Sequence, residues 1–220
     1  MEKNKKIWRG FAGILILAAL TGSFICQMIA TKIPTPFGRV IGYFSYFTEY
    51  SNILVMLWFI NKSFLNEKIK FLNKKSVRGA LTLYICIAGL VYFFVLESAW
   101  NQQGIEMIQS YILHGFAPIA FVLDWIVFGE KGDYTYKDIR YWVIFPIVYL
   151  FIALFFGKVI NVYPYPFLDL NVISLNKFFM NVIQLVVEFL VMAFIIVSVD
   201  KLLNKVNSFR KKSVKFANNN

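Results

Sequence analysis

The single histidine of the chain, His114, lies inside an apolar segment that is long enough to cross a lipid bilayer. Pro118 follows four residues later, and because proline has no backbone N–H, the carbonyl of His114 loses its usual helical partner. Asp124 comes ten residues after the histidine, about 15 Å further along a helix. Ionisable side chains inside such segments are costly to bury in lipid and usually mark functional sites. The alternative is that His114 donates one hydrogen bond between helices, worth less than about 2 kcal/mol.

A second group of polar side chains lies between Phe44 and Asn52, just before an apolar run that ends near Ile60. On a continuous helix, one face would carry Ser45, Thr48, Ser51 and Asn52. Such a face could line a cavity, or its hydroxyls could hold neighbouring helices together. A threonine hydroxyl becomes a nucleophile only when a base takes its proton. We expect Thr48 and His114 to lie at the same depth, which makes them the candidate catalytic pair for acyl transfer.

A nucleophile and a base need a third group to orient the imidazole ring. Glu97, near the end of the third apolar segment, and Glu188, on a polar stripe of the last one, are the candidates for this role. The expected supporting pocket consists of Glu97, Ser51, Asn52, Tyr111 and Glu188. Asp124 faces away from His114 on an ideal helix, so we expect it to pair with another helix or with water.

Other kinds of site lack their characteristic residues. One histidine with no carboxylate three or four residues later falls short of the usual metal-ligand sets. The sequence has neither a glycine-rich phosphate loop nor a Gly-x-Ser-x-Gly turn. We therefore expect no metal and no cofactor.

The composition is that of a membrane protein. Hydrophobic residues make up 59% of the chain, including 24 phenylalanines, whereas ordinary soluble domains are about half apolar. Six segments are apolar over about 20 residues. The sequence predicts an all-α bundle of six transmembrane helices within one domain, residues 1–205, followed by a basic and polar tail, residues 206–220. The expected spans are about 10–30, 41–60, 77–98, 107–128, 139–157 and 177–199.

The net charge of +11 is distributed as in a multi-pass membrane protein rather than a nucleic-acid-binding one. Nineteen of the 23 Lys and Arg residues fall at the N-terminus, at 62–78, at 131–140 and at 201–215. This asymmetry predicts that both termini are cytoplasmic and that the cytoplasmic face attracts anionic membrane lipids. No nucleic-acid-binding motif accompanies the charge, so we expect no nucleic-acid partner. Cys26 and Cys86 lie at different expected depths and should remain free thiols.

The loop at 162–169 contains two X-Pro pairs, which favour an extended and stiff backbone. Its aromatic residues suit the membrane interface. The loop could be a lid over a cavity or an interfacial plug, and the sequence favours neither.

Three motifs together resemble the bacterial Pr6Pr family of six-span membrane proteins: the segment from Phe44 to Asn52, the Leu113-His114 segment that ends in Leu123-Asp124-Trp125, and Tyr165-Pro-Phe-Leu-Asp169. That family is similar in turn to the androgen-induced-gene/FAR-17a proteins of animals, which are intramembrane threonine hydrolases of fatty acid esters of hydroxy fatty acids. The resemblance covers nearly the whole chain. It places the catalytic threonine at Thr48 and the histidine at His114, whereas Tyr111 stands where the animal proteins have a further histidine.

This resemblance implies a hydrolase of fatty acyl esters in a bacterial plasma membrane, with membrane lipids and a lipid-like ester as its partners. A different function remains open, namely a small-molecule or ion transporter, or a lipid-binding protein without catalysis. In a transporter, the polar stripes would line a path, and Glu188 and Asp124 would be the proton or ion sites. A third possibility is a family member that acts only as a scaffold for a partner.

Overall fold

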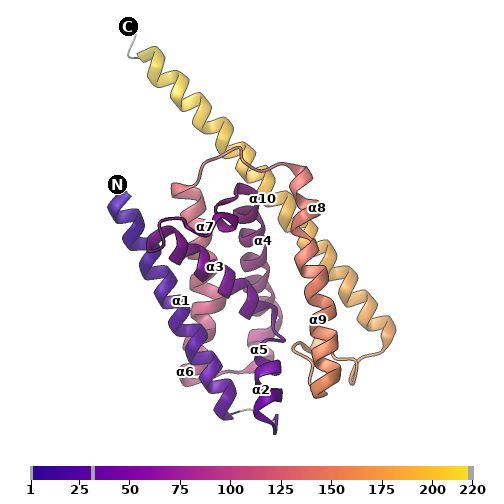
Figure 1. The fold of residues 1–220 in the computed structure, drawn as a ribbon. Coiled ribbons are helices and arrows are strands. Elements are labelled where there is room, and N and C mark those ends of the chain that lie inside the picture. The colour runs from indigo at the N-terminus through magenta and orange to yellow at the C-terminus, as the bar shows by residue number, and fades with distance from the viewer. Residues whose placement is uncertain (1, 31–32, 218–220) are drawn as a thin grey trace.

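The computed structural model describes residues 2–30 and 33–217, and within these ranges the regular structure is entirely helical. Figure 1 shows the helices arranged as a bundle, with the start of α1 and the end of α10 at the same end. The loops after α3 and α7 also lie at this end, so the predicted basic segments gather on one side of the bundle.

Within the described residues, five helical segments are long and apolar enough to cross a membrane. The first is α1 (Glu2–Ala30). The second joins α4 (Lys75–Val91), the π-helical turn η2 (Tyr92–Leu96) and α5 (Glu97–Trp100). The third joins α6 (Gly104–Tyr111), the π-helical turn η3 (Ile112–Phe116) and α7 (Ala117–Phe128). The fourth comprises η4 (Tyr136–Asp138), α8 (Ile139–Trp142) and α9 (Ile144–Ile160), and the fifth lies in α10 (Leu175–Ala217).

The expected continuous span at 41–60 is divided into two helices, α2 (Pro36–Tyr43) and α3 (Phe47–Ser63). The Ser45 hydroxyl donates to the carbonyl of Gly42 at 2.7 Å, and Tyr46 takes an extended conformation before α3 begins. Serine side chains that bond to nearby backbone compete with helix in this way. The predicted helical face that included Ser45 is therefore wrong, and Thr48 lies in the first turn of α3 rather than two turns inside a span.

The 17-residue α3 is about 25 Å long, and it is not among the five helices long and apolar enough to cross a membrane. It packs mainly against α1 and also contacts α4. Val55, Trp58 and Phe59 are fully buried in these contacts. The helix that carries Thr48 is thus held inside the bundle by its neighbours.

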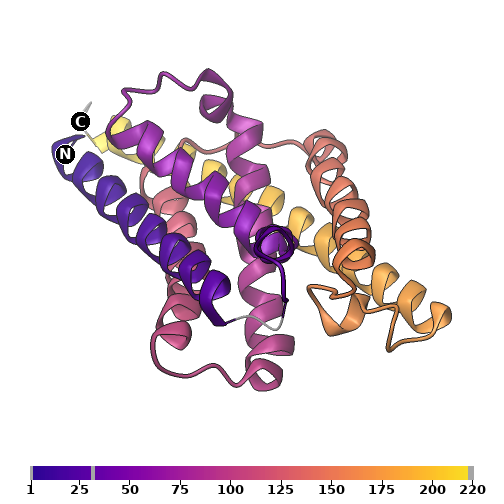
Figure 2. The same cartoon turned by 60° about the horizontal axis from the view of Figure 1, so that its bottom comes forward.

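Helix α9 and the first part of α10 stand to one side of the group formed by α1, α3, α4 and α7, while the rest of α10 passes behind α3 and α4 in the view of Figure 2. Only 17% of the most apolar stretch of each of these two segments is buried within the protein, compared with 61% for the segment that contains α4. Apolar helices that leave so much surface uncovered are expected to face lipid. The chain therefore has the all-helical construction of a multi-pass membrane protein.

Asp124 was expected to pair with another helix or with water, and the structure shows it paired with two other helices. Its carboxylate accepts two hydrogen bonds from Arg9, at 2.7 and 2.9 Å, and a third from Arg78 at 2.5 Å. Both guanidinium groups lie within 5 Å of the centre of the Trp58 ring. Because Asp124 is fully buried, this cluster joins α1, α4 and α7 through a desolvated ionic contact.

Two further predictions concern the ends of helices and the cysteines. Helix α10 continues through most of the segment predicted as a tail, since it ends at Ala217. Residues 218–220 lie outside the described part of the chain.

Cys26 and Cys86 are free thiols, as expected. The loop before α10 contains one short helix, η5 (Pro166–Leu168), and the loop before α4 contains another, η1 (Lys70–Asn73).

Candidate active site

The structure brings the side chains of Thr48 and His114 into direct contact. The Thr48 hydroxyl oxygen lies 3.1 Å from Nε2 of His114, although 66 residues separate the two positions in the chain. Each residue is only 5% exposed. The predicted pair therefore meets inside the protein, at hydrogen-bonding distance.

The second ring nitrogen fixes the direction of this hydrogen bond. Nδ1 of His114 lies 2.9 Å from the backbone carbonyl of Ser110, and a carbonyl can only accept. Nδ1 must therefore carry a proton, which leaves Nε2 of the neutral ring as an acceptor for the Thr48 hydroxyl. This is the arrangement that a general base needs in order to take a proton from a nucleophile.

The proposal that a carboxylate orients the ring is wrong. Glu97 accepts a hydrogen bond from Tyr111 at 2.9 Å, and Glu188 accepts one from Gln184 at 2.8 Å, both on exposed parts of the protein. The ring is held instead by the Ser110 carbonyl, one helical turn before the histidine. A backbone carbonyl cannot be recognised as an orienting group from residue types alone.

Two π-helical turns lie at the site, and one of them carries His114. The turn η3 includes His114, while η2 begins at Tyr92, whose ring stacks on the imidazole with centres 4.1 Å apart and planes 12° from parallel. Such turns often occur at functional sites because they displace side chains from the regular helical positions. The stacking covers one face of the imidazole and keeps the ring in its plane.

A glycine allows α4 to approach this turn closely. A Cβ atom built on Gly89 would lie 2.7 Å from the backbone carbonyl oxygen of His114 and 3.0 Å from Pro118. This carbonyl is the one that Pro118 leaves without its usual helical partner. The position of His114 therefore depends on the absence of a side chain at residue 89.

The beginning of α3 places backbone N–H groups beside the Thr48 hydroxyl. Thr48 is the second residue of the helix, and Tyr46 at the N-cap makes no side-chain capping bond. The first N–H groups of a helix have no partner within it, and they give this end a partial positive charge. A negative charge that develops next to Thr48 would therefore be stabilised.

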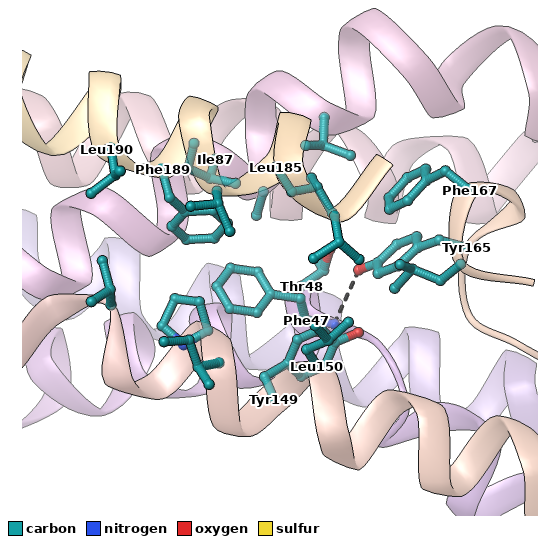
Figure 3. A pocket seen from close by; sticks show the side chains of 18 of the residues that line it. Phe47, Thr48, Ile87, Tyr149, Leu150, Tyr165, Phe167, Leu185, Phe189 and Leu190 are labelled. Atoms are coloured by element: carbon teal, nitrogen blue, oxygen red, sulfur yellow. Dashed lines mark hydrogen bonds between the residues drawn. The ribbon is translucent and has the colours of Figure 1, made fainter. Parts of the chain in front are cut away.

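The N–H of Phe47 donates to the hydroxyl of Tyr165 at 3.0 Å, as Figure 3 shows. Burial raises the pKa of Tyr165 to about 12, so this hydroxyl keeps its proton at neutral pH. The loop at 162–169 was expected to be a lid over a cavity or an interfacial plug, and this contact decides for neither. The loop reaches inward and bonds to the helix that carries Thr48.

Thr48 lines two cavities of opposite character. The first, of about 340 Å³, lies between α4, α9 and α10 and is almost entirely apolar (Figure 3). Its lining includes Leu150, Leu185, Phe189 and the η5 residue Phe167. Leu190 and other lining residues of α9 and α10 are partly exposed, so the cavity reaches the lipid-facing side of these helices. An alkyl chain could enter such a cavity from a membrane.

The second cavity, of about 330 Å³, is mainly polar and lies near α2, α5 and α6, at the end of the bundle opposite the start of α1. Both Thr48 and His114 line it. Its other polar lining residues are Ser23, Gln27, Tyr43, Tyr46, Glu49, Gln102, Glu106, Gln109 and Ser110. The threonine hydroxyl is thus at the boundary between an apolar space and a polar one.

The predicted supporting residues are divided between the site and the surface. The Ser51 hydroxyl and the Asn52 amide both donate to the carbonyl of Thr48, at 3.0 Å each. Asn52 also donates to the carbonyl of Leu113, so it connects the two helices next to the Thr48–His114 pair. The predicted Ser51 and Asn52 are therefore structural neighbours of the pair, although neither lines either cavity. Tyr111, like Glu97 and Glu188, lies apart from both cavities.

Several residues of the site were missed by sequence reasoning. The aromatic Tyr92 and the glycine at residue 89 resemble ordinary packing residues of an apolar helix, and nothing in their spacing points to His114. Glu49 follows Thr48 directly and was a recognisable signal, because it is a carboxylate beside the proposed nucleophile. Its side chain is only 6% exposed, and it lines the polar cavity.

The two acidic residues considered for transport, Asp124 and Glu188, are each paired with other side chains. Asp124 is neutralised by Arg9 and Arg78, and Glu188 pairs with Gln184 within α10. Neither acidic residue lines either of the two cavities that contain Thr48.

Comparison with protein-family models, with curated proteins and with solved structures finds no match to this chain. The class of protein therefore rests on the fold and the site. The part of the chain that the structure describes has five helices long and apolar enough to cross a membrane, and the site is a buried threonine–histidine pair between an apolar cavity and a polar one.

Proposed function

We propose that this protein is an intramembrane hydrolase of fatty acyl esters, with Thr48 as the nucleophile and His114 as the general base. The observation that carries the proposal is the 3.1 Å contact between the Thr48 hydroxyl and Nε2 of His114, at the boundary of the two cavities. The motifs that resemble the Pr6Pr family support the same assignment, and we include membership of that family in the proposal.

In the first half of the reaction, the Thr48 oxygen attacks the carbonyl carbon of the ester while its proton moves to Nε2 of His114. The carbonyl oxygen becomes an oxyanion, which the partial positive charge at the start of α3 and the Tyr165 hydroxyl would stabilise. The bond to the alcohol oxygen then breaks. The leaving alcohol takes the proton from Nε2, and the acyl group stays on Thr48.

In the second half, a water molecule in the polar cavity attacks the acyl-threonine and gives a proton to His114. The bond between the acyl carbon and the Thr48 oxygen breaks, and Thr48 recovers its proton from Nε2. The products are a fatty acid and an alcohol, and both catalytic side chains return to their starting state.

The two cavities suit the two halves of such a substrate. The apolar cavity is suited to the alkyl chain, because it buries aliphatic and aromatic side chains and opens between lipid-facing helices. The polar cavity is suited to the alcohol portion and to water. The carbonyl would lie between them, next to Thr48.

The test uses purified protein in neutral detergent and measures fatty acid release from a long-chain ester. Thr48→Ala and His114→Ala should each lower kcat by at least about 1,000-fold, since pairs of this kind act as a unit. Both variants should keep the thermal unfolding midpoint within a few degrees. Full activity in either variant would reject the mechanism.

A covalent probe gives an independent measurement. A fluorophosphonate should label the wild type on Thr48, and mass spectrometry should locate the adduct there. His114→Ala should reduce the labelling rate because the hydroxyl loses its base. Ser51→Ala is the matched control, since it removes a neighbouring hydroxyl that lines neither cavity.

A further inference from the structure

The polar cavity has a distinct charge character. Among the lining residues that the structure describes, two are carboxylic acids, Glu49 and Glu106, and none is lysine or arginine. Glu106 is exposed, whereas Glu49 is 94% buried next to Thr48. The alcohol portion of the substrate would therefore meet a carboxyl group at both the rim and the inner end of this cavity.

Glu49 also has an unused hydrogen-bond acceptor. Its Oε2 atom is buried and has no hydrogen-bond partner within the described part of the chain. Tyr43 lies beside this carboxyl group, but its hydroxyl donates to the carbonyl of Leu20 at 2.9 Å. Leaving a buried carboxylate oxygen without a partner is unfavourable, so this atom is suited to contact a positively charged ligand.

Aromatic rings complete the cavity. Tyr43, Tyr46 and Trp100 all line it. The rings of Tyr46 and Trp100 are perpendicular, with an interplanar angle of 88° and centres 5.8 Å apart. Aromatic rings attract cations through their faces, and proteins use rings that line a cavity to recognise quaternary ammonium groups.

We propose that the polar cavity selects esters whose alcohol portion carries an ammonium group. This inference rests on the proposed hydrolase function and specifies its leaving group. An alcohol that carries a carboxylate would be repelled by the exposed Glu106, whereas an ammonium alcohol would contact Glu49 and the aromatic rings. His114 then protonates the departing alcohol oxygen as described above.

The test compares three palmitate esters that differ only in their alcohol. These are the ester of choline, the ester of 3,3-dimethylbutanol, in which carbon replaces the nitrogen, and the ester of 4-hydroxybutanoate, which is anionic. The choline ester should have a kcat/KM at least about tenfold higher than its neutral isostere, and the anionic ester should be the poorest substrate. Equal values for all three, or a preference for the anionic ester, would overturn the inference while leaving the hydrolase function intact.

Two variants assign the preference to the cavity. Glu49→Gln should reduce the ratio between the choline ester and its neutral isostere towards one, and a ratio cancels any general loss of activity. Glu97→Gln is the matched control, because it removes the same charge from a residue that lines neither cavity, and it should preserve the ratio. An unchanged ratio in Glu49→Gln would also overturn the inference.

A binding measurement separates the two proposals. In the Thr48→Ala background, the hexadecyl ether of choline should bind at least about tenfold more tightly than the hexadecyl ether of 3,3-dimethylbutanol, measured by quenching of tryptophan fluorescence. This preference should be lost with Glu49→Gln. If none of the esters is cleaved, the hydrolase function fails, and the binding preference still decides the character of the cavity.

Discussion

Replacing Gly89 by alanine would add a methyl group where α4 comes closest to the turn that carries His114. The new Cβ atom would lie 2.7 Å from the His114 carbonyl oxygen, about 0.7 Å short of the 3.4 Å at which contacts with a Cβ become ordinary. The atom in the way belongs to the backbone, and the next nearest belongs to a proline ring. Neither can move aside by changing a rotamer, so the helices must separate.

The size of this separation predicts the size of the effect. A shift of a few tenths of an ångström to 0.7 Å along the line between Thr48 and His114 would lengthen their 3.1 Å contact beyond hydrogen-bonding distance. Misplacement on the scale of 1 Å costs about 100-fold in rate. Overpacking also destabilises by about 1–3 kcal/mol, partly offset by the higher helix propensity of alanine, about 1 kcal/mol.

The assay measures kcat for a long-chain ester and the thermal unfolding midpoint of the same preparation. Gly89→Ala should lower kcat by about 100-fold and lower the midpoint by a few degrees. Gly115→Ala is the matched control, because this glycine follows His114 directly and its added Cβ would meet only Phe93, at an ordinary 3.5 Å. Wild-type turnover in Gly89→Ala, or an equal loss in Gly115→Ala, would refute the argument that this close approach positions the histidine.

Two further changes test the surroundings of the site. Asp124→Asn removes the charge that pairs with Arg9 and Arg78 and leaves two buried cations uncompensated. We expect the free energy of unfolding, measured by denaturant titration in micelles, to fall by about 3–5 kcal/mol. An unchanged stability would contradict a structural role for the contacts of Asp124 with the two arginines. Tyr165→Phe keeps the ring but removes the acceptor of the Phe47 N–H. The unpaired donor should lower the free energy of unfolding by about 1–3 kcal/mol. If the hydroxyl also stabilises the oxyanion, kcat should fall more than KM changes, whereas a change in KM alone would exclude that role.

The pairing of Thr48 with His114 could be predicted because the chain has a single histidine. A single histidine in an apolar segment and a hydroxyl in another apolar segment can meet only if both lie at one depth, and hydropathy gives approximate depths. The structure shows Thr48 and His114 in contact, although Thr48 lies at the start of α3 and not inside a continuous span. The all-helical fold follows from the composition, since apolar segments of this length must satisfy their backbone internally.

The details of the site depend on departures from regular helix, which periodicity cannot reveal. The prediction of a continuous second span was wrong because local bonding at Ser45 ends α2 before α3 begins. The orienting group for His114 is a backbone carbonyl, and every residue has one. The partners of Asp124, Arg9 and Arg78, come from helices remote in sequence, so only their tertiary arrangement identifies them.

The position of the apolar cavity between α9 and α10 determines how a substrate would be supplied. An ester dissolved in the surrounding bilayer would reach Thr48 by lateral diffusion in two dimensions, without passing through water. The rate of such an enzyme depends on the mole fraction of ester among the lipids, and adding inert lipid at constant total ester should slow it. The released fatty acid would return to the same leaflet, where its accumulation would compete for the cavity and limit turnover.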